Sequence, residues 1–202
     1  MQPLLALARL IDRITAGIGK TVMWLILVAV IVSAGNAAVR KIAPQYASNA
    51  WLELQWYLFG AVFMLAASYT LQQNEHVRID IFYGSRTRRS QHWIDLFGHV
   101  FFTLPFVTLM AWMLVPYTFD AYRIGQISTN AGGLIIWPAR ALLAAGFILL
   151  IFQAVAEIIK KVAIIRGLIE DPHPFHSPQE HADEETGELV ADLAATKREG
   201  RK

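Results

Sequence analysis

Residues 96–119, LFGHVFFTLPFVTLMAWMLVPYTF, form an unbroken stretch of 24 residues without Asp, Glu, Lys or Arg. The hydrocarbon core of a bilayer is about 30 Å thick, and a helix needs roughly 20 predominantly apolar residues to cross it. This stretch therefore predicts a membrane-spanning helix, and it decides the fold class of the chain.

Three further regions repeat this pattern. Thr21 to Val39 is uncharged over 19 residues, and Leu54 to Asn74 is uncharged over 21. The fourth region consists of two uncharged stretches of 16 residues, 124–139 and 141–156, separated by Arg140, which can extend to the headgroups from near the helix start. The sequence predicts an all-α polytopic membrane protein whose transmembrane domain covers residues 21–168, with spans at about 21–40, 53–74, 95–119 and 134–159.

The composition agrees with this class. The 202 residues are 55% apolar and 17% charged, which is unusual for a soluble domain. The net charge of +2 is unevenly distributed along the chain. Residues 171–202 hold eight acidic and four basic side chains, and the other residues hold 14 basic and 8 acidic side chains. The chain has no Cys, which excludes disulfides, thiolate metal sites and cysteine nucleophiles.

Both ends of the chain lie outside the predicted spans. In residues 1–20, five apolar side chains recur every three or four positions: Leu4, Leu7, Ile11, Ile14 and Ile18. This pattern predicts an amphipathic helix on the membrane surface. A cytoplasmic extension of the first span fits equally well, and Gly17 and Gly19 favour a bend between the two. Residues 169–202 start proline-rich and lack apolar periodicity, which predicts a disordered, acidic cytoplasmic tail.

Basic residues near the span ends set the expected orientation, because cytoplasmic loops carry an excess of Lys and Arg. Ten fall on one side of a four-span topology: Arg9, Arg13, Lys20, Arg78, Arg86, Arg88, Arg89, Lys160, Lys161 and Arg166. The other side receives Arg40, Lys41 and Arg123, so both termini are expected in the cytoplasm. Five of the cytoplasmic residues are candidate contacts to anionic lipid: Arg9, Arg13, Arg86, Arg88 and Arg89.

A cleaved signal peptide is an alternative interpretation of the first span, since residues 33–38 are rich in the small side chains that cleavage needs. About 20 residues with the pattern of an ordered helix precede the apolar run, unlike a short basic leader. An uncleaved first span is therefore expected. In the third span, Pro105 and Pro116 predict static kinks.

Motifs for chemistry are missing. The first three windows lack charged residues, whereas a transporter working alone normally places them along its pathway. His99 is interpreted as hydrogen-bonded packing, and the tail histidines His173, His176 and His181 lack preorganised geometry for a metal. The sequence contains no HExxH, phosphate-binding glycine loop or Gly-x-Ser-x-Gly. No catalytic residue, cofactor, metal or nucleic-acid partner is predicted.

Polar residues at the two ends of the second span are the candidate structural or subunit-interface residues. Glu53 precedes the apolar run, and Arg78 and Asp80 follow it among apolar neighbours. If these charges are even partly buried, each needs a neutralising partner. A solvated loop in which they pair with each other is the alternative, and the residues alone do not decide.

The chain resembles the small membrane subunit of tripartite ATP-independent periplasmic (TRAP) transporters, the DctQ-like family, over roughly residues 10–168. Besides the four-span hydropathy, the resemblance rests on these features: the Glu53 region, the run His76-Val77-Arg78-Ile79-Asp80-Ile81, the turn Gly125-Gln126-Ile127-Ser128, and Gly132-Gly133-Leu134 with Trp137-Pro138. Gln126 departs from the pattern, since many relatives carry a glutamate before the serine.

The resemblance implies that three proteins carry out separate parts of transport. In such systems a periplasmic binding protein captures an organic acid, and a large multispanning subunit moves it across the bacterial inner membrane with sodium. The small subunit packs against the large one as a scaffold, with phospholipids as further partners. Substrate and ion sites then lie on the large subunit. Four residues are expected to make structural contacts within the chain or across the subunit interface: Glu53, His76, Arg78 and Asp80.

Two other classes of protein are alternatives. A stand-alone channel or exporter would need oligomers lined by weakly polar residues such as Ser33, Asn36, Ser68 and Thr70, and transport by the purified protein in liposomes would favour it. A membrane anchor of a respiratory complex would need haem ligands, which a visible absorption spectrum detects. The scarcity of charge inside the spans favours the scaffold.

Overall fold

The computed structural model describes residues 1–74 and 86–171 of the chain. Four helical stretches in this part are long and apolar enough to cross a bilayer: Gln2–Ile42, Asn49–Gln72, Arg88–Ile124 and Trp137–Ile165. The all-α, four-span fold class expected from the uncharged windows is confirmed. Most of the predicted tail, from residue 172 onward, lies outside the described residues.

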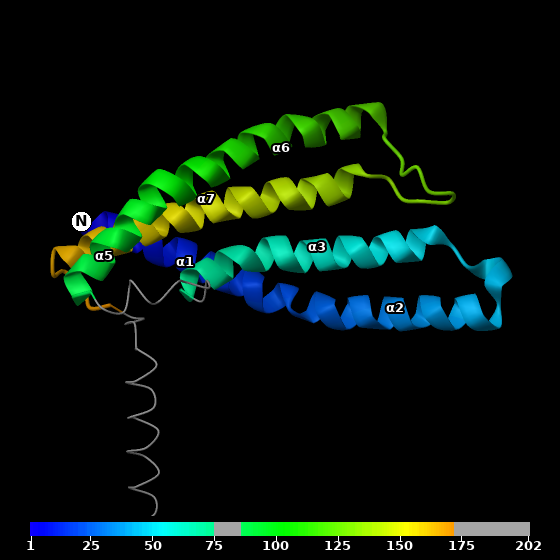
Figure 1. The fold of residues 1–202 in the computed structure, drawn as a ribbon, viewed down its shortest axis with the longest axis horizontal. Helices are drawn as coiled ribbons and strands as arrows, with labels where there is room; N and C mark the ends of the chain where they lie inside the picture. The colour runs from blue at the N-terminus through cyan, green and yellow to red at the C-terminus, as the bar shows by residue number, and fades with distance from the viewer. Residues whose placement is uncertain (75–85, 172–202) are drawn as a thin grey trace, which may run out of the picture.

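Four helices lie side by side in one row (Figure 1). Their order is α2 (Trp24–Ile42), α3 (Asn49–Gln72), α7 (Trp137–Ile165) and α6 (Leu104–Ile124). α3 and α7 are neighbours that run in the same direction, although α6 separates them in the chain. We call the end of the row that carries residues 125–136 the loop end, and the opposite end the α1 end. The row is open, so broad apolar faces of its helices remain uncovered.

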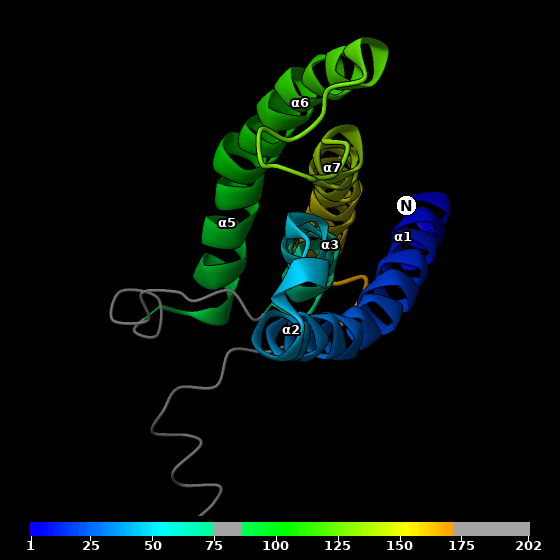
Figure 2. The same cartoon turned by 90° about the vertical axis from the view of Figure 1, so that its right-hand side faces the viewer.

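Helix α1 (Gln2–Val22) packs across α3 and α7 rather than standing apart from them. Figure 2 shows α1 and α5 on opposite sides of α7. A Cβ on Gly19 would lie 2.6 Å from Tyr69 Cβ, so glycine allows the close approach of α1 to α3. The break between α1 and α2 falls at Met23, four residues beyond Gly19.

The third span is an arch rather than a straight rod (Figure 1). It consists of α5 (Arg88–Gly98), a π-helical turn (His99–Thr103) and α6. The Leu104 N–H donates to the His99 carbonyl, five residues earlier, directly before Pro105, which has no N–H to donate. The π-helical turn thus lies where the first kink was predicted, and Pro116 lies inside α6.

Small residues form the contacts between helices. A Cβ on Gly146 of α7 would lie 2.8 Å from the Met64 backbone oxygen of α3, so these two backbones approach closely. Ala154, Ala156 and Ala163 of α7 are fully buried. The large apolar side chains mostly face outward, as expected where lipid and not water surrounds the helices.

The helix bounds differ from the predicted span bounds at both ends of α7. The helix begins at Trp137, three residues after the predicted start, because Ser128 N–H donates to Leu134 O and Ile136 N–H donates to Gln126 O in the preceding loop. It continues to Ile165, beyond the predicted end near residue 159, because Lys160 and Lys161 both find carboxylate partners.

Candidate functional site

Glu53 is the centre of a polar cluster at the loop end. Its side chain is 5% exposed and accepts three hydrogen bonds from the segment between α6 and α7. The Ser128 hydroxyl and Asn130 Nδ2 (2.8 Å) donate to Oε1, and the Leu134 N–H donates to Oε2 (2.6 Å). These donors satisfy a buried carboxylate that has no Lys or Arg within ion-pair distance among the described residues.

The loop is shaped to fit this carboxylate. Gly125 ends α6 with φ +62°, and Gly132 turns the chain back with φ +71°, a backbone region that favours glycine. A Cβ on Gly133 would lie 2.8 Å from Glu53 Oε1 and 2.6 Å from Ser128 Cβ. Glycine at this position therefore leaves the space that Glu53 occupies.

Further hydrogen bonds hold the same loop against α3. Asn49 Nδ2 donates to the Ala131 carbonyl (3.0 Å), and the Tyr57 hydroxyl donates to the Ile135 carbonyl (3.0 Å). Arg40 Nη2 at the end of α2 donates to Asn49 Oδ1 (3.2 Å). The α2–α3 hairpin thus fixes the connection between the other two spans of the row.

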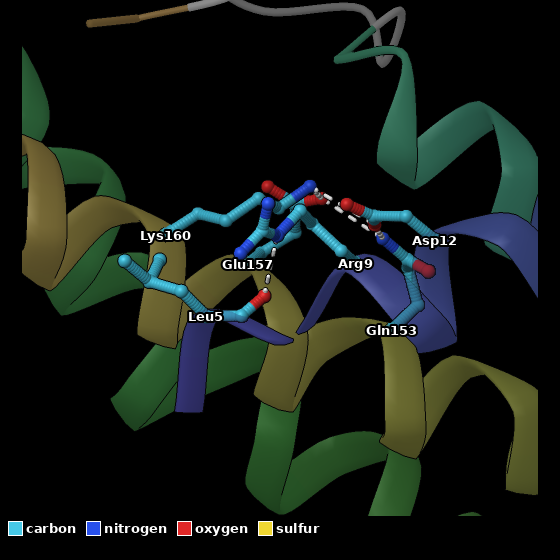
Figure 3. Close-up of polar contacts among 6 residues, drawn as sticks. All are labelled: Leu5, Arg9, Asp12, Gln153, Glu157 and Lys160. Carbon is cyan, nitrogen blue, oxygen red and sulfur yellow. Dashed lines mark hydrogen bonds and ion pairs between the residues drawn. The ribbon is translucent and has the colours of Figure 1, made fainter. Parts of the chain in front are cut away.

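A second cluster lies at the α1 end and joins α1 to α7 (Figure 3). Gln153 Nε2 donates to Asp12 Oδ1 (2.8 Å) and to Glu157 Oε1 (2.9 Å). Lys160 Nζ lies 3.1 Å from Asp12 Oδ1 and 2.6 Å from Glu157 Oε1. One ammonium group and one amide therefore bridge two carboxylates on neighbouring helices, and Gln153 is fully buried.

The next residue of α7 makes a separate pair. Lys161 Nζ lies 2.8 Å from Asp95 Oδ2 of α5, and both side chains are buried. The consecutive lysines thus connect α7 to helices on its two sides, Lys160 to α1 and Lys161 to α5. Nearby, His92 Nδ1 lies 3.7 Å from Asp171 Oδ2.

The predicted site residues have different outcomes. Glu53 is buried in the loop-end cluster, whereas His76, Arg78 and Asp80 lie outside the described residues. The five candidate lipid contacts are all exposed: Arg9, Arg13, Arg86, Arg88 and Arg89. Arg9 Nε donates to the Leu5 carbonyl of its own helix (3.3 Å) (Figure 3). Contact with lipid remains a prediction for these arginines.

Sequence reasoning missed the α1-end cluster. Glu157 and Gln153 are four residues apart on an apolar helix and so share one face, a signal for a buried polar contact. The lysines that follow resemble basic residues that set the orientation, and Asp12 fits the polar face of an amphipathic helix. In the described residues, no group of three or more His, Asp or Glu is arranged to hold a metal.

The fold and both clusters define a class: a multi-pass helical membrane protein whose buried charges bind its own helices together. The family is shown by comparison. The sequence model for tripartite ATP-independent periplasmic transporters, DctQ component, matches residues 40–163. The chain belongs to this family, as the resemblance indicated, and is the small membrane component of a TRAP transporter in the inner membrane. This family is a transporter component and not an enzyme family. Searches of curated proteins and of solved structures gave no match.

Proposed function

We propose that the protein is a scaffold for the large TRAP membrane subunit during sodium-coupled, binding-protein-dependent uptake of an organic acid. The observation that supports this is that the charged side chains inside the fold pair with groups of the same chain. Six charged side chains bind partners within the chain, at the two ends of the row: Glu53 at the loop end, and Asp12, Asp95, Glu157, Lys160 and Lys161 at the α1 end. A substrate or ion pathway requires polar groups facing it near the bilayer midplane, and we assign those groups to the large subunit.

The proposed orientation places the loop end in the periplasm and the α1 end in the cytoplasm. At the loop end the described basic residues are few: Arg40, Lys41, Arg123 and Arg140. The α1 end holds Arg9, Arg13 and Lys20 of α1 with the arginines before and within α5, in agreement with the positive-inside bias. In this orientation the loop fixed by Glu53 faces the periplasmic binding protein, and it is a surface that this protein can contact.

The proposed interface residues follow the sequence prediction. His76, Arg78 and Asp80 follow α3 in the sequence, and we propose that they contact the large subunit. Replacing Arg78 or Asp80 should lower the yield of the complex without changing substrate choice. A change of substrate preference with the complex intact would contradict this role.

Copurification tests the scaffold directly. A tagged small subunit is coexpressed with the large subunit, extracted in mild detergent and recovered on the tag. We expect both subunits in the eluate in fixed proportion, and uptake in proteoliposomes only when both are present with the binding protein. Recovery of the small subunit alone, or solute transport by this protein alone in liposomes, would overturn the proposal. The latter outcome would favour the stand-alone channel.

A further inference from the structure

An apolar groove follows one face of α6 where it passes α7. Two open hollows of about 530 and 540 Å³ lie along this face and share Thr108 and Trp112 in their linings. The first extends to Pro116 and reaches Ile151 of α7, and the second extends toward Pro105. Thr108 supplies the only hydroxyl in either lining, so the groove suits a hydrocarbon ligand.

A basic residue stands at the loop end of this groove. Thr108, Trp112, Pro116, Phe119 and Arg123 follow one another at spacings of four, four, three and four residues, which places them on one helix face. The Arg123 guanidinium lies 5.4 Å from the Phe119 ring centroid. Within the described residues, no carboxylate lies within ion-pair distance of Arg123. Stacking on a ring leaves guanidinium N–H groups free to donate to an anion.

The dimensions fit a lipid of one leaflet. Fifteen residues separate Thr108 from Arg123, a rise of about 22 Å along the helix. Half of a bilayer with its headgroup region is also about 20–22 Å thick. A phosphate at Arg123 would therefore place an acyl chain of the same molecule beside Pro116, Trp112 and Thr108.

A lipid chain suits this lining, which is apolar apart from the Thr108 hydroxyl. Arg123 is exposed at the loop end of the groove, where its guanidinium N–H groups are available to an anionic headgroup.

We propose that the groove along α6, which reaches α7 at Ile151, binds a phospholipid, with its phosphate on Arg123 and an acyl chain between Pro116 and Thr108. The site lies wholly on this chain, so the inference does not rest on the proposed scaffold function. The lipid is then a structural ligand of the small subunit itself.

Native mass spectrometry of the full-length protein tests this site. The protein is reconstituted in vesicles of phosphatidylethanolamine and phosphatidylglycerol, released in mild detergent, and the phospholipids that remain bound to each chain are counted. Thr108→Trp fills the groove and should abolish the retained lipid. Met113→Trp is the matched control, because Met113 is 60% exposed on α6 and lines neither hollow. Equal retention by the two variants, at equal helix content by circular dichroism, would overturn the proposal.

Variants that remove one positive charge, and a lipid that lacks the phosphate, test the contact between the phosphate and Arg123. Arg123→Gln should lower lipid retention about fivefold, since a basic residue near an anionic headgroup contributes about 1 kcal/mol. Lys41→Gln removes a charge from the same end on α2 and should leave retention unchanged. Diacylglycerol, which lacks the phosphate, should be retained no better by the unaltered protein than by Arg123→Gln. Strong retention of diacylglycerol by the unaltered protein would rule out the assigned role of Arg123.

Photocrosslinking in cells separates a lipid from a protein occupant. Benzoylphenylalanine replaces Trp112, in the groove, or Met113, outside it, in cells that also produce the large subunit. We expect phospholipid adducts at position 112 well above those at position 113. Crosslinking of position 112 mainly to the large subunit would show that a protein helix occupies the groove and would refute the proposal.

Discussion

Glu53 shows how a single buried carboxylate can join distant segments of a membrane protein without a basic partner among the residues that the structure describes. Its two oxygens accept from a hydroxyl, a side-chain amide and a backbone N–H that all belong to one loop. Such charge-assisted hydrogen bonds are stronger than those between neutral groups. Glu53 therefore joins α3 to a segment that lies 75 to 81 residues later in the chain.

Glu53→Gln should destabilise the protein by about 2 kcal/mol. An amide has one acceptor oxygen in place of two, and its NH₂ group would face a donor of the loop. The measurement is the midpoint of thermal unfolding in detergent at a fixed heating rate, followed by circular dichroism. Glu170→Gln is the control, because Glu170 is exposed and the same chemical change there should leave the midpoint unaltered. Equal midpoints for the two variants would contradict the structural role of Glu53.

Gly146→Ala should separate α3 from α7 and destabilise the protein by about 1–3 kcal/mol. The new methyl group would lie 2.8 Å from the Met64 backbone oxygen, which cannot move away as a flexible side chain can. Gly60→Ala is the matched control, since a Cβ at Gly60 meets nothing within 4 Å. That change should be neutral or stabilise α3 by up to about 1 kcal/mol. The same thermal unfolding measurement compares them, and a milder effect at Gly146 than at Gly60 would disprove the close contact.

At the scale of single elements, α7 connects the other helices. It contacts α3 and α6 along the row, and at the α1 end Lys160 and Lys161 attach α1 and α5. Ion pairs of this kind are costly to break, because one partner is left buried without its counter-ion. The position of α1 is therefore set by specific side chains as well as by its apolar stripe.

Lys160→Met should loosen α1 and cost about 3 kcal/mol, because Asp12 and Glu157 would then face each other without the ammonium group between them. Hydrogen–deuterium exchange of residues 2–22 measures the release of α1 directly, and faster exchange is expected there. Lys20→Met is the control, since Lys20 is an exposed residue in the last turn of α1. Unchanged exchange in Lys160→Met would mean that apolar packing alone holds α1.

At the scale of the whole molecule, the orientation across the membrane can be tested because the chain has no Cys of its own. Gln45→Cys places a thiol at the loop end, and Glu170→Cys places one at the α1 end; both positions are exposed. A membrane-impermeant maleimide should label Gln45→Cys in intact spheroplasts and Glu170→Cys only after the membrane is permeabilised. The reverse pattern would invert the proposed topology.

The spans could be predicted from the sequence, whereas their arrangement could not. Uncharged windows of 19 to 24 residues reveal a membrane helix because charge in the bilayer core is costly. The row order was not predictable, because large apolar side chains face lipid and helices alike. Gly146 and Ala154 mark close helix contacts only once the neighbouring helix is known.

The polar clusters were predictable only in part. Glu53 is conspicuous in the sequence because it precedes a long apolar run, but its partners Ser128, Asn130 and Leu134 belong to a distant loop and no local pattern connects them. Asp12 and Lys160 are 148 residues apart and resemble ordinary surface charges near span ends. Long-range partners of this kind depend on the helix order, which the sequence pattern does not contain.

The long sequence separation within the loop-end cluster also has a consequence for biogenesis. A nascent chain that has inserted α2 and α3 carries Glu53 before residues 128–134 have been synthesised, so its carboxylate has none of its three final donors. The hairpin of α2 and α3 therefore lacks these three hydrogen bonds until the loop has been made. Completion of the loop-end cluster thus requires translation through residue 134, and a chain truncated before Ser128 would lack all three donors to the Glu53 carboxylate.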